Sequence, residues 1–317
     1  MSASSMTRKP APDSAINLAE CLAHLINGAG GSADPNAILT ALGAGLAFFF
    51  REVPGEEIPE LAECHDFALP EAAGLFGIRL RAMHPPRARF GLSESAEFAG
   101  HFADSYVPLI QRAIENGQRV LTLHGWSSTS STTWGIVERC EQDGDAIWGA
   151  VPDRFEPTQL SHAALQCYVV EEIAPVEPTA EAVLARGAET ALNLNARGTV
   201  VYPGLLTGET VLLRLIELHA ARGDQLSSDG LIEVIKQMEH RRAQTAAYLE
   251  QHVSDWDATT CVAVKTLASS LEKDVEACVA LQNRPDAHAL KSQLEIRLGL
   301  DRTILRDLAS ISSSDGQ

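Results

Sequence analysis

The stretch at residues 133–153 reads TWGIVERCEQDGDAIWGAVPD, and it decides the fold class. Its two ends, at residues 133–140 and 146–151, are rich in the β-branched and aromatic residues that favour strands. The Gln-Asp-Gly-Asp between them is typical of a turn. We therefore expect an antiparallel hairpin here, with neighbouring strands at residues 119–124 and 166–171.

Helical patterns surround this hairpin. Apolar residues recur at helical spacing before it, and Asn27-Gly28 and Asn116-Gly117 mark two of the helix ends. The expected helices are those at residues 15–26, 35–42, 70–76, 96–116 and 161–165. A buried strand is expected at residues 45–50. The N-terminal part is therefore predicted to be α+β with an antiparallel sheet.

The sequence APVEP at residues 174–178 is typical of a linker, because it combines two prolines with a charge. Beyond it, helical periodicity continues with few strand signals. The expected helices are those at residues 179–195, 208–222, 228–252, 257–282 and 287–310. We therefore divide the chain into a disordered tail (1–14), an α+β domain (15–175) and an all-α helical domain (176–317).

The chain is acidic, with 25 Lys and Arg against 42 Asp and Glu and a formal net charge of −17. Such a charge repels phosphate backbones and anionic lipid at long range, so nucleic acid is not an expected partner. No apolar run approaches the roughly 20 residues of a membrane helix. The polar start of the sequence does not resemble a secretion signal. We expect no membrane partner and a cytoplasmic location.

Cofactor motifs are missing from the sequence. Its 6 cysteines include no C-x-x-C pair, and no phosphate-binding G-x-x-x-x-G-K-S/T loop is present. The group Cys64-His65-Asp66 is expected to be structural, because adjacent residues seldom converge on one ion without a further ligand. We expect neither a metal nor a cofactor.

Several stretches are similar to one known family. They are INLAECLAHLI at 16–26, LGAGLAFFF at 42–50, the stretch at 133–153, LSHAAL at 160–165 and QCYVVEE at 166–172. Residues 15–173 thereby resemble the N-terminal domain of the butirosin biosynthesis protein H type, which is related to the peptidases that process double-glycine leaders of bacteriocins. The sequences GETVLLRLIEL at 208–218 and EHRRAQTAAYLEQ at 239–251 resemble the helical segment that follows such domains in some bacterial proteins. The resemblance implies a papain-like fold.

The resemblance also implies a catalytic cysteine on the first helix, and Cys21 fits this position. In the family a histidine begins the strand after a glycine-rich loop, where this chain has Thr132, Thr133 and Trp134. His124, at the end of the preceding strand, is the candidate replacement. Asp153, in Val-Pro-Asp, stands where the family has Asp-Pro. The candidate catalytic residues are therefore Cys21, His124 and Asp153.

The family's oxyanion-hole glutamine has no counterpart shortly before Cys21, where Asn17 is the nearest amide donor. Cys21 also lies within the apolar pattern of its helix, as a small buried core residue would. A thiol without an imidazole partner keeps a pKa of about 8.5 and supplies little thiolate at neutral pH. These departures favour a degenerate site.

The loop GWSSTSSTTW at residues 125–134 places a run of hydroxyl residues between two tryptophans. It is either a flexible hairpin loop or a binding loop over the cleft. In a binding loop, the tryptophan faces would pack against a ligand and the hydroxyls would orient it. The candidate ligand-binding residues are Trp126, Ser128, Thr133 and Trp134.

Three hypotheses about function follow. The favoured one is a catalytically degenerate papain-like protein that binds a peptide or a small molecule in its cleft. The second is an active thiol enzyme, either a peptidase or an acyl- or aminoacyltransferase, with Cys21 as nucleophile. The third is an interaction protein that forms a homodimer through apolar stripes of the helical domain, formed by residues such as Leu231, Val234, Ile235 and Met238.

Overall fold

The computed structural model describes residues 13–51, 60–61, 68–83, 96–127, 133–141, 146–152, 155–201, 205–207, 209–222, 228–282 and 287–314. The α-helices are α1 (Ser14–Gly28), α2 (Pro35–Ala41), α3 (Leu69–Leu75), α4 (Ala96–His101), α5 (Val107–Glu115), α6 (Ala180–Val201), α7 (Glu209–Arg222), α8 (Ser228–Gln251), α9 (Ala258–Gln282) and α10 (Ala287–Ser314). The strands are β1 (Phe49–Arg51), β2 (Glu60–Leu61), β3 (Ile78–Ala82), β4 (Arg119–Leu123), β5 (Trp134–Cys140), β6 (Ile147–Ala150), β7 (Pro157–Leu160), β8 (Gln166–Ile173) and β9 (Leu205–Thr207). The fold is mixed helix and sheet, as the α+β prediction requires.

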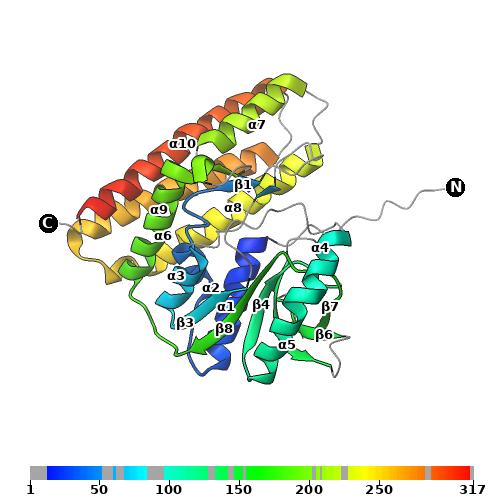
Figure 1. Cartoon of the computed structure of the whole chain (residues 1–317). Helices are drawn as coiled ribbons and strands as arrows, with labels where there is room; N and C mark the ends of the chain where they lie inside the picture. Colours follow the sequence, from blue (N-terminus) through cyan, green and yellow to red (C-terminus); the bar gives the residue numbers. More distant parts are fainter. Residues whose placement is uncertain are drawn as a thin grey trace.

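Within the described residues, six strands form an antiparallel sheet in the order β3-β8-β4-β5-β6-β7. Alternate side chains of its central strands enter two different cores. Leu121 of β4 faces the core that contains α1, whereas Val120 faces the core that contains α5. Figure 1 shows α4 and α5 in front of the sheet and α1 behind it. The predicted hairpin corresponds to the antiparallel β5–β6 pair of this sheet.

The α+β part and the helical part share one hydrophobic core. Leu22 of α1, Leu184 of α6 and Leu267 of α9 belong to the same cluster of buried side chains. In addition, β9 of the helical part pairs with β1 of the α+β part. In Figure 1, β1 lies among the long helices. The boundary predicted between residues 175 and 176 therefore does not separate two independent cores, and the helical part is not entirely helical.

Two predicted elements differ from the structure. The helix expected at residues 161–165 is a loop, because the N–H groups of Ser161 and His162 donate to the carbonyl of Gly125 instead of forming a helical turn. The strand expected at residues 45–50 begins only at Phe49, because Leu46 and Ala47 donate to the carbonyl of Gly43 in a turn. In both places a local pattern was overridden by hydrogen bonds that the fold supplies.

The helix expected at residues 96–116 is interrupted by a π-helical turn at Phe102–Tyr106. Pro108, near the start of α5, has no N–H to donate to the preceding turn, and a wider turn accommodates this loss. The short strands β2, β3, β7 and β9 were not predicted. Their length and mixed polarity give little period-2 signal.

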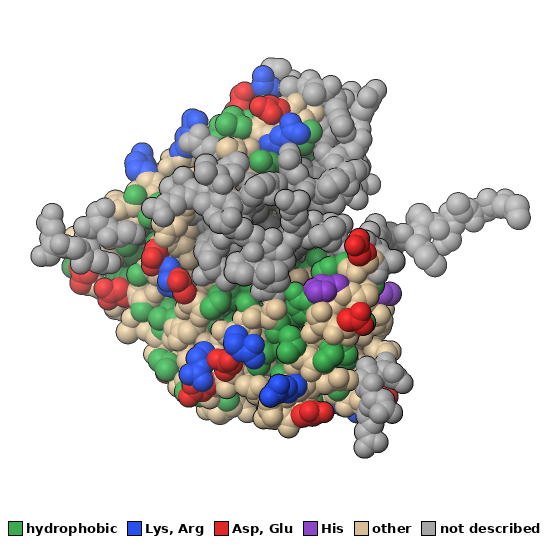
Figure 2. Space-filling view, in the orientation of Figure 1, with side chains coloured by type: hydrophobic (Ala, Val, Ile, Leu, Met, Phe, Trp, Pro, Cys, Tyr) green, Lys and Arg blue, Asp and Glu red, His purple; other side chains and the backbone are tan. Residues whose placement is uncertain are grey.

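The described face of the molecule in Figure 2 shows acidic and basic side chains interspersed rather than gathered into a patch of one sign. Within the described residues, no helix has both the length and the apolarity needed to cross a membrane.

Candidate functional site

Cys21 lies in the middle of α1 and is completely buried, with 0% exposure. Burial raises the pKa of its thiol well above the usual value, and the Glu20 carboxylate raises it further. A nucleophilic cysteine needs the opposite shift, because the thiolate is the reactive form. Cys21 is therefore a neutral, enclosed thiol at pH 7 in this structure.

The face of α1 that carries Cys21 packs on the sheet at β5. Asn17, one turn earlier on this face, accepts a hydrogen bond of 2.8 Å from the backbone N–H of Trp134 through its Oδ1 atom. His24, almost one turn later, stacks its ring on Phe155 with the ring centroids 4.0 Å apart. The start of β5 thus lies at Asn17, one helical turn from the predicted nucleophile.

The N-terminus of α1 is already occupied by a carboxylate of the chain itself. Asp13 Oδ1 accepts hydrogen bonds from the N–H groups of Ala15 (2.9 Å) and Ile16 (3.2 Å). Arg241 of α8 donates to the same carboxylate, with Nε 2.8 Å from Oδ2, and its side chain is fully buried. Because a helix N-terminus favours a negative charge, Asp13 already occupies the anion-binding position at the start of α1.

His124 follows β4 and is half-buried, with a left-handed backbone (φ 72°). Its N–H donates to the carbonyl of Thr133 at 2.9 Å, so the backbone at these two residues closes the end of the β4–β5 pair. The Thr133 side chain is buried. The other candidates, Asp153 and Ser128, lie outside the described residues.

The two tryptophans of the predicted binding loop are core residues, with Trp126 3% and Trp134 0% exposed. Trp134 packs near Tyr168 in the core on the α1 side of the sheet. Trp126 belongs to the opposite core, where its indole covers the backbone of Gly135 and Gly149. The rings therefore point to opposite faces of the sheet, and in this structure they do not form one surface for a ligand.

The apolar stripe considered for dimerisation is also buried within the chain. Its residues Leu231, Val234, Ile235 and Met238 pack in a core cluster with Phe48 and Phe50. They are therefore not an exposed stripe. Among the described residues, no group of three or more His, Cys, Asp or Glu side chains is placed to hold a metal ion.

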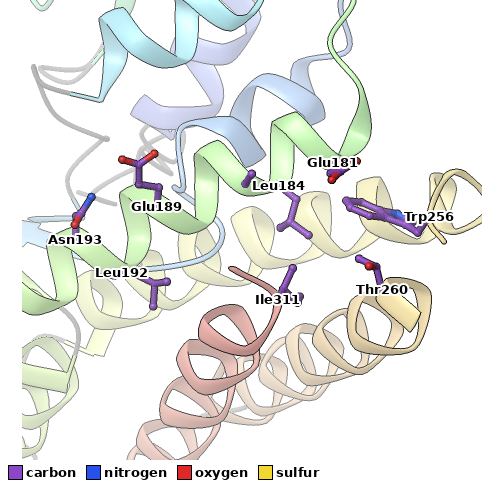
Figure 3. A pocket seen from close by; sticks show the side chains of 9 residues that line it. Glu181, Leu184, Glu189, Leu192, Asn193, Trp256, Thr260 and Ile311 are labelled. Carbon is purple, nitrogen blue, oxygen red and sulfur yellow. The ribbon is translucent and has the colours of Figure 1, made fainter. Parts of the chain in front are cut away.

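A pocket of roughly 280 Å³ lies elsewhere, among α6, α9 and α10. Its lining residues are Glu181, Leu184, Ala185, Glu189, Leu192, Asn193, Trp256, Thr260 and Ile311. In Figure 3, Glu181 and Trp256 lie at one end and Glu189 and Asn193 at the other, with Leu184 and Ile311 between them. The pocket combines an apolar middle with polar groups at both ends, as ligand sites in proteins generally do.

Local structure fixes the Trp256 end of this pocket. The short 3₁₀ turn at Val253–Asp255 precedes Trp256, and His252 Nδ1 lies 2.7 Å from Asp255 Oδ2 across it. Asp257 then caps α9 by accepting hydrogen bonds from the N–H groups of Thr259 and Thr260. The tryptophan thus lies between this 3₁₀ turn and the capped start of α9.

At the other end, Arg186 Nη2 forms an ion pair of 2.8 Å with Glu189, and its Nη1 atom pairs with Glu71 of α3 at 2.6 Å. The pair with Glu71 joins α6 to the α+β part.

Sequence reasoning did not find this pocket. The only local signal is SDWD at residues 254–257, a large aromatic residue between helix-capping polar residues where two helices meet. Its partners Glu181 and Ile311 are distant in the sequence, and helical periodicity alone does not reveal which of them meet.

No protein-family model matches this chain. No curated protein is significantly similar to it in sequence.

Proposed function

We propose that this protein binds a small molecule, without covalent chemistry, in the pocket among α6, α9 and α10. The observation that carries the proposal is the pocket itself, in which an apolar middle formed by Leu184 and Ile311 separates polar ends at Glu181 and Asn193. Its volume of roughly 280 Å³ suits a small ligand rather than a folded partner.

The state of Cys21 favours binding over thiol chemistry. The side chain is enclosed, and its pKa is raised by burial and by the Glu20 carboxylate. A peptidase or an acyltransferase would have to undo each of these features to form a thiolate.

A papain-like arrangement of the α+β part belongs to the same proposal. It is supported by α1, whose Asn17 packs at the start of β5 on one face of an antiparallel sheet, as a cysteine-bearing helix would in that fold. In this proposal the fold has lost its chemistry and serves as a scaffold for the helical pocket. A cytoplasmic location is part of the proposal and rests on the sequence alone.

The test fills the pocket with a side chain. Ala185 is an exposed residue of α6 that lines the pocket, so Ala185→Trp occupies the space without disturbing a core. Ala247→Trp, at an exposed position of α8 outside the pocket, is the matched control. A panel of fragment-sized compounds is screened against the full chain by ligand-observed NMR and thermal shift.

We expect compounds that bind the wild-type chain to stabilise it by an amount that rises with the logarithm of their concentration once this exceeds Kd. They should lose binding in Ala185→Trp and keep it in Ala247→Trp. If they bind both variants equally, the pocket is not the site and the proposal is wrong.

A further inference from the structure

The two carboxylates that line the pocket differ in their partners. Glu189 is paired with Arg186 at 2.8 Å. Glu181, in the first turn of α6, is exposed and forms no ion pair with any residue that the structure describes. Glu181 therefore brings to the pocket a negative charge that these residues do not neutralise.

Further negative charge surrounds the same end. Asp255 and Asp257 flank Trp256 in the sequence, and hydrogen bonds from Thr260 and from the N–H groups of Thr259 and Thr260 lower the pKa of Asp257. His252, four residues before Trp256, is paired with Asp255. With a net charge of −17 on the chain, this end attracts cations and repels anions.

Trp256 adds a surface that suits a cation. Its indole nitrogen is buried, so a ligand in the pocket meets the carbon part of the ring. An ammonium group over such a ring is attracted by the ring's quadrupole. A carboxylate and an indole at one end of an apolar pocket are complementary to an amine joined to an apolar body.

We infer that the ligand of this pocket is a small amphipathic amine. Its ammonium group pairs with Glu181 beside Trp256, and its apolar body lies along Leu184 and Ile311. This inference rests on the proposed function, because it names the chemistry of the molecule that the pocket binds.

Three probes of equal chain length separate charge from apolarity: hexylamine, 1-hexanol and hexanoate. Their binding to the full chain is measured by calorimetric titration at pH 7. We expect hexylamine to bind about threefold more tightly than 1-hexanol, since one exposed ion pair is worth about that factor. Hexanoate should bind more weakly than either.

Two matched variants assign the preference to one carboxylate. Glu181→Gln should abolish the advantage of hexylamine and leave the affinity for 1-hexanol unchanged. Glu272→Gln, at an exposed position of α9 away from the pocket, should change neither.

The outcomes separate this inference from the proposed function. If 1-hexanol binds as tightly as hexylamine and Ala185→Trp blocks both, the pocket binds ligands but the preference for a cation is wrong. If Glu181→Gln retains the preference, Glu181 is not its source and the inference is also overturned. If Ala185→Trp blocks none of the three probes, or none binds, both the inference and the proposed function fail.

Discussion

Arg242 of α8 donates a hydrogen bond of 2.7 Å from Nη1 to the main-chain oxygen of Gly45, in the turn before β1. The same atom donates to the oxygen of Leu46 at 2.8 Å, and the guanidinium lies 4.3 Å from the centre of the Phe48 ring. A buried arginine of the helical part thus holds the turn that precedes β1. The two parts of the chain are joined by buried polar contacts as well as by a shared core.

Gly45 allows α8 to pack closely on this turn because it has no side chain. A Cβ atom at this position would overlap Thr245 Oγ1 and lie 2.5 Å from the main-chain oxygen of Arg241. We expect Gly45→Ala to lower the free energy of unfolding by about 1–3 kcal/mol, the usual cost of overpacking. Urea denaturation followed by circular dichroism measures the change.

Gly299→Ala is the control for this variant. Gly299 lies within α10 and a Cβ atom there would meet no atom within 4 Å. Alanine should therefore stabilise the protein, by about 0.5–1 kcal/mol. A loss of stability in Gly299→Ala as large as that in Gly45→Ala would contradict the packing argument.

Asp274 of α9 bridges two buried arginines. It accepts from Arg297 Nε at 2.8 Å and from Arg242 Nε at 3.1 Å. Asp274→Asn would leave both guanidinium groups buried with less compensating charge, so we expect a loss of about 3–5 kcal/mol at pH 7. Chemical denaturation of the variant and the wild-type chain measures this difference.

The pH dependence of that loss has a definite sign. Despite the opposing effect of burial, Arg297 and Arg242 hold the pKa of Asp274 below its usual value. Its contribution is therefore present above the unfolded pKa of about 3.9 and is lost as pH falls through the lower folded pKa. The stability difference between wild type and Asp274→Asn should shrink when pH is lowered from 7 to 3. A constant difference would contradict the lowered pKa of Asp274.

Asp301 provides a comparison within the same network. Its carboxylate accepts a hydrogen bond of 2.7 Å from Arg242 Nη2, yet burial raises the pKa of Asp301. Its ionised form is thus less well compensated than that of Asp274, and Asp301→Asn should cost less stability at pH 7. Equal losses in the two variants would show that the arginines do not distinguish them.

The sequence predicts the elements whose pattern is local. The β5–β6 pair follows from its strand composition and from the Gln-Asp-Gly-Asp sequence between the strands, and α1 follows from apolar spacing that ends at Asn27-Gly28. The features that the sequence does not predict depend on contacts between residues that are far apart in the chain. Asp13 and Arg241, whose pair covers the start of α1, are 228 positions apart.

The same reason limits prediction of the site. Trp126 and Trp134 flank a polar run in the sequence, a pattern that suits ligand binding, but in the structure their rings lie in opposite cores. The pocket arises where α6, α9 and α10 converge, and no residue type in it marks that convergence in advance.

Cys21 should be unreactive in the folded chain. Its thiol is buried and its pKa is raised, whereas Cys261 is half-buried at the start of α9. We expect iodoacetamide to modify Cys21 at least about a hundredfold more slowly than Cys261 at pH 7.5, because reaction requires local opening. Peptide mass mapping measures both rates, and in 8 M urea, about enough to unfold most domains, they should become similar.

Rapid modification of Cys21 in the native chain would restore the thiol-enzyme hypothesis.

The contribution of Cys21 to stability depends on pH with a definite sign. Because the folded pKa lies above the unfolded value of about 8.5, the contribution of Cys21 to stability is present below that pH and decreases as pH rises toward the folded pKa.

Asn17 joins α1 to the sheet through its buried hydrogen bond from the N–H of Trp134. Asn17→Ala removes the acceptor and leaves a buried donor, so we expect a loss of about 1–3 kcal/mol in the free energy of unfolding.

Asn17→Asp keeps an acceptor but buries a charge close to Asp13. Its carboxyl should therefore have a raised pKa, and the variant should recover stability as pH falls through that pKa. Denaturation of both variants between pH 7 and pH 4 separates the two effects: Asn17→Asp should approach the wild type at low pH, whereas Asn17→Ala should not. Parallel curves for the two variants would mean that the hydrogen bond to Trp134 does not hold the helix on the sheet.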